Sequence, residues 1–147
     1  MPWCVSFHIY GEAFRPSRVP FQFTKQHDPG IIGIIGRYRG QPVPYGCASY
    51  EVPSSVPNID RIKHVVETFE PLLGEIRAAG ATDWHIDICR YYNAQCNEGY
   101  TLEEMQLISR LQCGFTYSAY SVSKREERKL ERKLETFEKV ETIEYID

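Results

Sequence analysis

The feature that most constrains the fold is a period-two alternation of apolar and polar side chains in four separate segments. Residues 3–10 show it most clearly, followed by residues 84–89, 47–52 and, more weakly, 115–122. Successive side chains of a strand point to opposite faces, so each segment is predicted to be a strand with one face in a core. If these strands share a sheet, its other face gathers histidines, carboxylates, hydroxyls and thiols.

One long stretch has helical spacing instead. Residues 58–79 carry apolar side chains three and four positions apart, which is typical of a helix with one buried face. Asn58 is the predicted N-cap and Gly80 the predicted stop. Because Pro71 lacks a backbone N–H and crowds the preceding turn, a kink is predicted near residues 67–71.

A second helix is predicted from Thr101 to about residue 112. The Thr101 hydroxyl and the Glu104 carboxylate have the spacing of a capping box. The side chains predicted to face inward are Leu102, Met105, Ile108 and Leu111.

The end of the chain is predicted to be a highly charged helix that opens with a second capping box at Ser123 and Glu126. A narrow apolar stripe that includes Leu130, Leu134 and Phe137 is wide enough to dock the helix on the domain. The alternative is that this stripe binds a partner or forms a homo-oligomer with a second copy of the chain.

These elements predict an α+β domain over residues 1–123, with a charged helical appendage over residues 124–147. The expected sheet is four- to five-stranded and mostly antiparallel, with two helices packed on one face. For residues 11–45 the pattern leaves two structures open in each part. Residues 11–28 form a turn of helix or an extended edge segment, and the glycine- and isoleucine-rich residues 30–40 form a strand or a packed loop.

Composition narrows the class of protein. The chain has 147 residues, which suits one domain that needs no disulfide or metal to fold. Five cysteines without a CxxC pair, and no signal sequence, favour free thiols and a cytoplasmic location. No apolar run is long enough for a membrane helix. With a net charge of −3, general nucleic-acid binding is not expected.

The polar face of the predicted sheet holds the candidate catalytic residues. His85 and Asp87 lie two apart on one strand and therefore on the same side, and His8 or Glu51 from neighbouring strands would join them as a general acid and base. The alternative is that these side chains only line the solvated face of an antiparallel sheet. Cysteines of the same strands are candidate nucleophiles beside the histidines or, alternatively, inert buried groups. No cofactor and no metal ion is predicted.

Three segments carry a resemblance to a known family: PYGCASYEVP, ETFEPLLGEIRAAGATD and HIDICRYYNAQCNEGYTLEEMQLISRL. Over residues 3–122 the chain resembles a bacterial domain-of-unknown-function family of small intracellular α+β proteins. Some members of that family are similar to immunity proteins, which are encoded beside secreted toxins. The resemblance implies a fold and a binding role, and it implies no mechanism.

The leading prediction is therefore a cytoplasmic bacterial protein-binding module, with a toxin-neutralising immunity protein as the class that the resemblance suggests. The rival prediction is a small-molecule-binding or hydrolytic domain that uses the polar sheet face. The predicted binding residues are Ser6, His8, Tyr45, Ser49, Glu51, His85, Asp87, Tyr91, Gln95 and Asn97.

Overall fold

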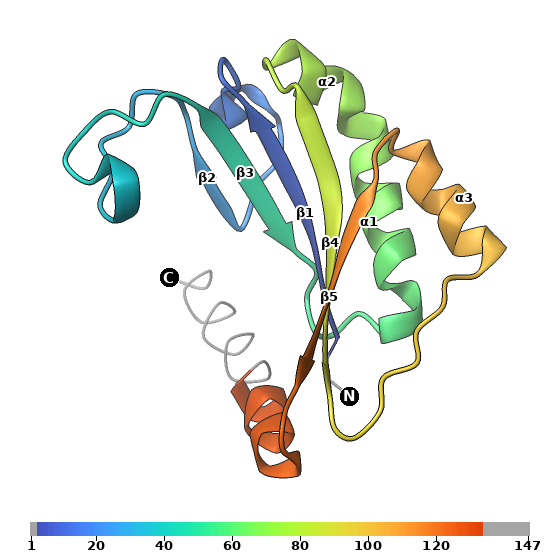
Figure 1. Cartoon of the computed structure of the whole chain (residues 1–147). Coiled ribbons are helices and arrows are strands. Elements are labelled where there is room, and N and C mark those ends of the chain that lie inside the picture. The colour runs from blue at the N-terminus through green and yellow to red at the C-terminus, as the bar shows by residue number, and fades with distance from the viewer. Residues whose placement is uncertain (1–2, 134–147) are drawn as a thin grey trace, which may run out of the picture.

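A computed structural model describes residues 3–133 of the chain, and Figure 1 shows its arrangement as a sheet with helices on one side. The strands are β1 (Trp3–Gly11), β2 (Lys25–His27), β3 (Gly46–Glu51), β4 (Asp83–Tyr92) and β5 (Phe115–Ser121). The helices are α1 (Arg61–Phe69), α2 (Leu73–Ala78) and α3 (Leu102–Arg110). Short 3-10 turns lie at η1 (Pro16–Arg18), η2 (Gly36–Tyr38), η3 (Asn58–Asp60) and η4 (Glu70–Leu72). The predicted α+β class is confirmed.

The five strands form one sheet in the order β2-β3-β1-β4-β5. All neighbours are antiparallel except β4 and β5, which are parallel. Parallel neighbours need a crossover connection, and α3 lies in the connection between β4 and β5. The first strand of the chain is therefore the central strand of the sheet.

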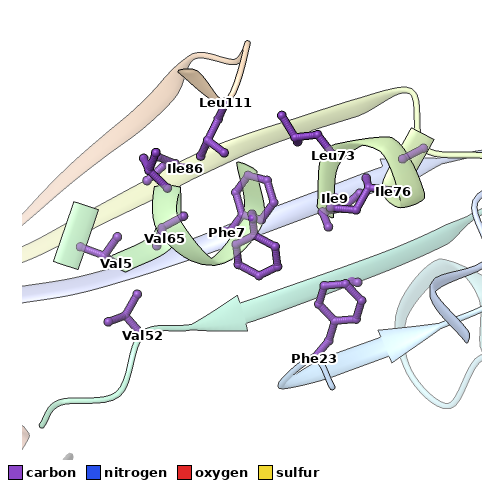
Figure 2. Packing of buried hydrophobic residues seen from close by; sticks show 14 of the residues in the cluster. Val5, Phe7, Ile9, Phe23, Val52, Val65, Leu73, Ile76, Ile86 and Leu111 are labelled. Carbon is purple, nitrogen blue, oxygen red and sulfur yellow. The ribbon is translucent and has the colours of Figure 1, made fainter. Parts of the chain in front are cut away.

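The core lies between the apolar face of the sheet and the three helices (Figure 2). Val5, Phe7 and Ile9 of β1 are buried, as their alternation predicts. They pack in one cluster with side chains of α1 and α2 such as Val65 and Ile76. The other face of the sheet, which we call the polar face, is turned away from α1, α2 and α3.

The predicted break in the long helix is also confirmed. Pro71 lies inside η4, which separates α1 from α2, because proline cannot donate the α-helical backbone bond. α2 ends at Ala78, and Gly80, the predicted stop, follows its C-cap residue with a φ of +101°. A Cβ added there would lie 2.4 Å from the Ala13 carbonyl oxygen, so this stop requires glycine.

Several predictions at the helix ends are wrong. Asn58 does not cap α1, because it lies in η3, and the N-cap residue of α1 is Asp60, whose side chain makes no capping hydrogen bond. Ile59, an apolar side chain of the stretch predicted to have one buried face, is 83% exposed. In α3, Ile108 and Leu111 are buried, but Leu102 and Met105 are exposed.

The capping box predicted at Ser123 and Glu126 forms in full, whereas at Thr101 the hydroxyl caps the helix and Glu104 Oε2 has no hydrogen-bond partner. The Thr101 hydroxyl accepts the Glu104 N–H at 3.1 Å. The Ser123 hydroxyl accepts the Glu126 N–H at 3.2 Å, and the Glu126 carboxylate accepts the Ser123 N–H at 2.8 Å. Residues 124–133 are helical.

Leu130 is half-buried, whereas Leu134 and Phe137 of the predicted stripe lie outside the described residues. Within the part of the chain that the structure describes, no helix combines the length and the apolar character needed to cross a membrane.

Candidate functional site

Two neighbouring rows of side chains cross the polar face from β3 through β1 to β4. The rows are Ser49, His8 and His85, and Glu51, Ser6 and Asp87. The sequence predicted that these side chains emerge from adjacent strands on one side, and the strand register brings them there because their parity is opposite to that of the buried residues.

Of the four candidate catalytic residues, His8 and His85 contact each other, and His8 and Asp87 each contact a neighbouring hydroxyl. Ser6 Oγ lies 2.9 Å from His8 Nε2, and the His8 and His85 rings stack with centroids 5.3 Å apart. The Thr116 hydroxyl of β5 donates to Asp87 Oδ1 at 2.6 Å. Burial, and after it the neighbouring His85, lowers the pKa of His8 below its ordinary value.

The remaining predicted binding residues are spread over the molecule. Tyr45 contacts the rings of Tyr10 and His27, both in a tilted arrangement, at one end of the polar face. Tyr91 lies toward the other end of β4 and stacks on Tyr120 of β5. Gln95 and Asn97 lie beyond Tyr92, in the loop that follows β4, where the Gln95 side chain donates to Asn97 Oδ1 at 3.3 Å.

The polar face is hollowed at the end of β1 that carries His8 and Tyr10. The hollow has a volume of about 390 Å³, within the range of small-molecule sites. The polar side chains that line it are His8, Tyr10, Lys25, Gln26, His27, Cys47, Ser49, Asp83 and His85. Glu51 and Asp87 do not line it, so the structure separates the two candidate carboxylates from the hollow.

A thiol and an imidazole meet in this hollow across β2 and β3. Cys47 and His27 are directly paired residues of these strands. Cys47 Sγ lies 3.0 Å from His27 Nε2, and His27 Nδ1 lies 3.4 Å from the backbone oxygen of Asp28. Burial raises the pKa of the Cys47 thiol above its ordinary value.

The other thiols have different surroundings. All five cysteines lie within the described residues and are free, as predicted. Cys4 and Cys89 are paired across β1 and β4, and burial is the largest cause that raises the pKa of each. Cys96 Sγ lies 3.4 Å from the hydroxyl of Tyr117. Among residues 3–133, no group of three or more His, Cys, Asp or Glu side chains has an arrangement suited to a metal ion.

A second surface feature is the loop of residues 30–40, which we call the isoleucine loop. Its four isoleucines are exposed: Ile31 by 51%, Ile32 by 56%, and Ile34 and Ile35 by 84% each. The loop is neither the strand nor the packed loop predicted for it. Figure 1 shows it, with η2, projecting from the β2–β3 side of the sheet, away from the helices.

Backbone hydrogen bonds hold the isoleucine loop in shape. Gly33 N–H donates to the Gln41 carbonyl at 2.9 Å, and Gly40 N–H donates to the Gly33 carbonyl at 2.8 Å. At the base of the loop, the N–H of Val43 donates to the Ile31 carbonyl at 2.8 Å. Gly33 has to be glycine, because an added Cβ would lie 2.3 Å from the Tyr38 oxygen.

Sequence reasoning did not assign His27 to the site, and it assigned no function to the four isoleucines. His27 lies in a strand of three residues, too short for an alternation to be read. The isoleucines were expected to be at least partly covered, since large apolar side chains are usually buried. Comparison with known proteins adds no assignment: no family model, no curated protein and no solved structure matches this chain, and the resemblance of residues 3–122 to a bacterial family stays a prediction.

Proposed function

We propose that this chain is a protein-binding module whose anchor is the isoleucine loop. The observation that carries the proposal is the exposure of Ile34 and Ile35, each 84%. Large apolar side chains gathered on a surface mark interaction sites. Covering one such side chain contributes about 1.5–3 kcal/mol, so a partner that covers both isoleucines gains about 3–6 kcal/mol from them before the cost of association is subtracted.

The shape of the loop supports this role. Its backbone hydrogen bonds present the isoleucines in one arrangement before any partner arrives. A surface that is ordered in advance loses less conformational entropy on association. The loop therefore has the properties of a preformed anchor.

The charges beside the anchor indicate the chemistry of the partner. Arg37 and Arg39 are exposed on the same loop, and the Arg37 guanidinium lies 5.6 Å from the Tyr38 ring centroid. Arginine is common in interfaces and pairs with carboxylates. The expected partner surface is apolar with acidic groups at its rim.

The interface extends from the loop toward the polar face. Tyr38 contacts Tyr45, with ring centroids 6.1 Å apart, and Tyr45 in turn contacts Tyr10 of β1 at 5.2 Å. Tyrosine supplies a large contact area at a small entropic cost. A partner seated on the isoleucine loop reaches the predicted binding residue Tyr45 without rearrangement of the sheet.

The proposed partner is a secreted toxin that this chain neutralises in the cytoplasm of the bacterium that makes it. This class of partner is what the resemblance of residues 3–122 to a bacterial family with immunity-protein-like members implies. The test is co-purification of the full chain with the product of the neighbouring gene. The variant Ile34→Asp/Ile35→Asp is expected to weaken binding at least tenfold, since about 1.4 kcal/mol corresponds to a factor of ten.

The matched control is Ile59→Asp, because Ile59 is equally exposed at 83% but lies at η3, beside α1. Binding that survives the double substitution, or that Ile59→Asp weakens equally, would exclude the isoleucine loop as the anchor. Failure of the neighbouring gene product to bind would exclude the toxin as partner.

A further inference from the structure

The hollow on the polar face contains a thiol that is paired with a base. Cys47 Sγ and His27 Nε2 are 3.0 Å apart, and both residues line the hollow of about 390 Å³. Cys96, in contrast, contacts a tyrosine hydroxyl, which is a poor base. A nucleophile within hydrogen-bond distance of a base is the arrangement of covalent catalysis.

The contact of His27 Nδ1 indicates which ring nitrogen carries the hydrogen and which one accepts it from the thiol. His27 Nδ1 lies 3.4 Å from the backbone oxygen of Asp28. A carbonyl oxygen only accepts, so the ring hydrogen is on Nδ1. Nε2 then has a free electron pair and accepts the hydrogen of the Cys47 thiol. The backbone of Asp28 acts as the orienting third group.

We propose that Cys47 is a nucleophile that accepts an acyl group from a small ester or thioester in the hollow, with His27 as its general base. This chemistry is separate from the protein binding proposed above and does not depend on it. It uses residues of β2 and β3 rather than the His8, Glu51, His85 and Asp87 set predicted from the sequence.

The protonation state of the thiol sets the order of events. Burial raises the pKa of Cys47, so at neutral pH the sulfur holds its proton until the substrate is present. His27 therefore has to remove that proton during the attack, as a general base does in acyl transfer. A mechanism in which the thiol is already deprotonated before the substrate binds would not need the imidazole as a base.

The atoms and electrons balance without an external oxidant or reductant. The Cys47 proton passes to His27 Nε2 as sulfur bonds to the carbonyl carbon, and the carbon–oxygen or carbon–sulfur bond to the leaving group breaks. The leaving group takes the proton from His27. Water then attacks the new thioester, gives its proton to His27, and releases the acid, and the sulfur regains its proton.

The hollow supplies groups suited to this step. Lys25 lines it, and its ammonium is a cation available to the oxyanion that forms at the carbonyl. Ser49, two residues after Cys47 on the same face of β3, adds a hydroxyl. The volume holds a small acyl compound rather than a polymer.

The test uses the full chain and p-nitrophenyl acetate. Release of p-nitrophenol is followed over time, and the acetyl group is located among the five cysteines by peptide mass spectrometry. Acetylation of Cys47 is expected to be faster than that of Cys96 by a factor on the order of 100, the usual contribution of general base catalysis. Acetyl groups spread evenly over the five thiols would overturn the proposal.

Three variants separate chemistry from folding. Cys47→Ser is expected to abolish the fast acetylation, whereas Cys96→Ser, the matched control, is expected to leave it unchanged. His27→Asn is expected to slow acetylation of Cys47 at neutral pH and to approach the wild-type rate at high pH, where the thiolate forms without a base. A purely structural role for His27 would instead lower the rate equally at every pH, and that result would overturn the assignment of the base.

Discussion

The imidazole rings of His8 and His85 stack across the two central strands of the sheet, with their centroids 5.3 Å apart and their planes inclined by 17°. Two imidazolium cations at this distance repel each other, and this repulsion adds to burial in lowering the pKa of His8. The position of His8 on the polar face therefore affects stability.

The first prediction concerns pH. Burial and His85 lower the pKa of His8, while the weaker influences of Asp87 and Glu51 raise it. The unfolded chain then binds more protons than the folded chain below about pH 6.5, the ordinary histidine pKa. The stabilisation is complete above that pH and is lost as the pH falls toward the lower folded pKa.

The substitution His8→Asn removes this titration. Urea unfolding measured at a series of pH values is expected to show a smaller loss of stability below pH 6.5 in the variant than in the wild type. Identical pH slopes for the two proteins would refute the prediction.

The second prediction tests the shape of the isoleucine loop. Gly33→Ala places a methyl group against the backbone of Tyr38, so the loop has to open. Hydrogen exchange of the Gly40 amide, which donates to the Gly33 carbonyl, is expected to speed up by about tenfold or more, since local opening sets the exchange rate.

Gly74→Ala is the matched control for that experiment, because a Cβ at Gly74 in α2 meets nothing within 4 Å. It is expected to leave exchange at Gly40 unchanged and to stabilise the protein by about 0.5–1 kcal/mol. Unaltered exchange in Gly33→Ala would show that the loop tolerates the added methyl group.

The third prediction concerns Arg61, a buried cation at the start of α1. Its guanidinium donates to the carbonyl oxygens of Val56 at 2.9 Å, Ser54 at 3.2 Å and Trp3. Arg61→Met leaves these acceptors without that donor, and we expect a loss of about 2–5 kcal/mol in the free energy of unfolding.

Lys63→Met on the same helix provides the comparison, because Lys63 is exposed and makes an ion pair with Glu67 at 3.8 Å. Such a surface pair contributes less than about 1 kcal/mol. Equal losses in the two variants, measured by urea unfolding, would contradict the anchoring role of Arg61.

The fourth prediction concerns the start of α3. The Thr101 hydroxyl accepts the Glu104 N–H, and Thr101→Ala is expected to lower the free energy of unfolding by about 1 kcal/mol. Thr101→Ser retains the oxygen and should retain most of the stability. If thermal unfolding of the serine variant matched that of the alanine variant, the hydrogen bond would not be the cause.

The sequence predicted those parts of the fold that depend on residues close together in the chain. The alternation in β1 identifies Val5, Phe7 and Ile9 as buried, because each strand has one face in the core. For the same reason, the face that carries His8 and His85 could be predicted. The break at Pro71 follows from the chemistry of one residue.

The sequence did not predict features that depend on distant pairing. His27 meets Cys47 only because β2 pairs with β3, and a strand of three residues shows no period. The exposure of Ile34 was not predicted, because large apolar side chains are usually buried and the sequence does not show whether another segment covers them. Gln95 was predicted as a binding residue, and its position is set by the loop after β4.

The central place of β1 determines when the protein can fold as it is made. Its two neighbours, β3 and β4, begin at Gly46 and Asp83, so both follow β1 in the chain. Pairing that spans such a sequence separation is slow and needs the later segments to be present. In a growing chain, β1 is therefore made before either neighbour, and this central strand is paired on both sides only once the chain extends through β4 to Tyr92.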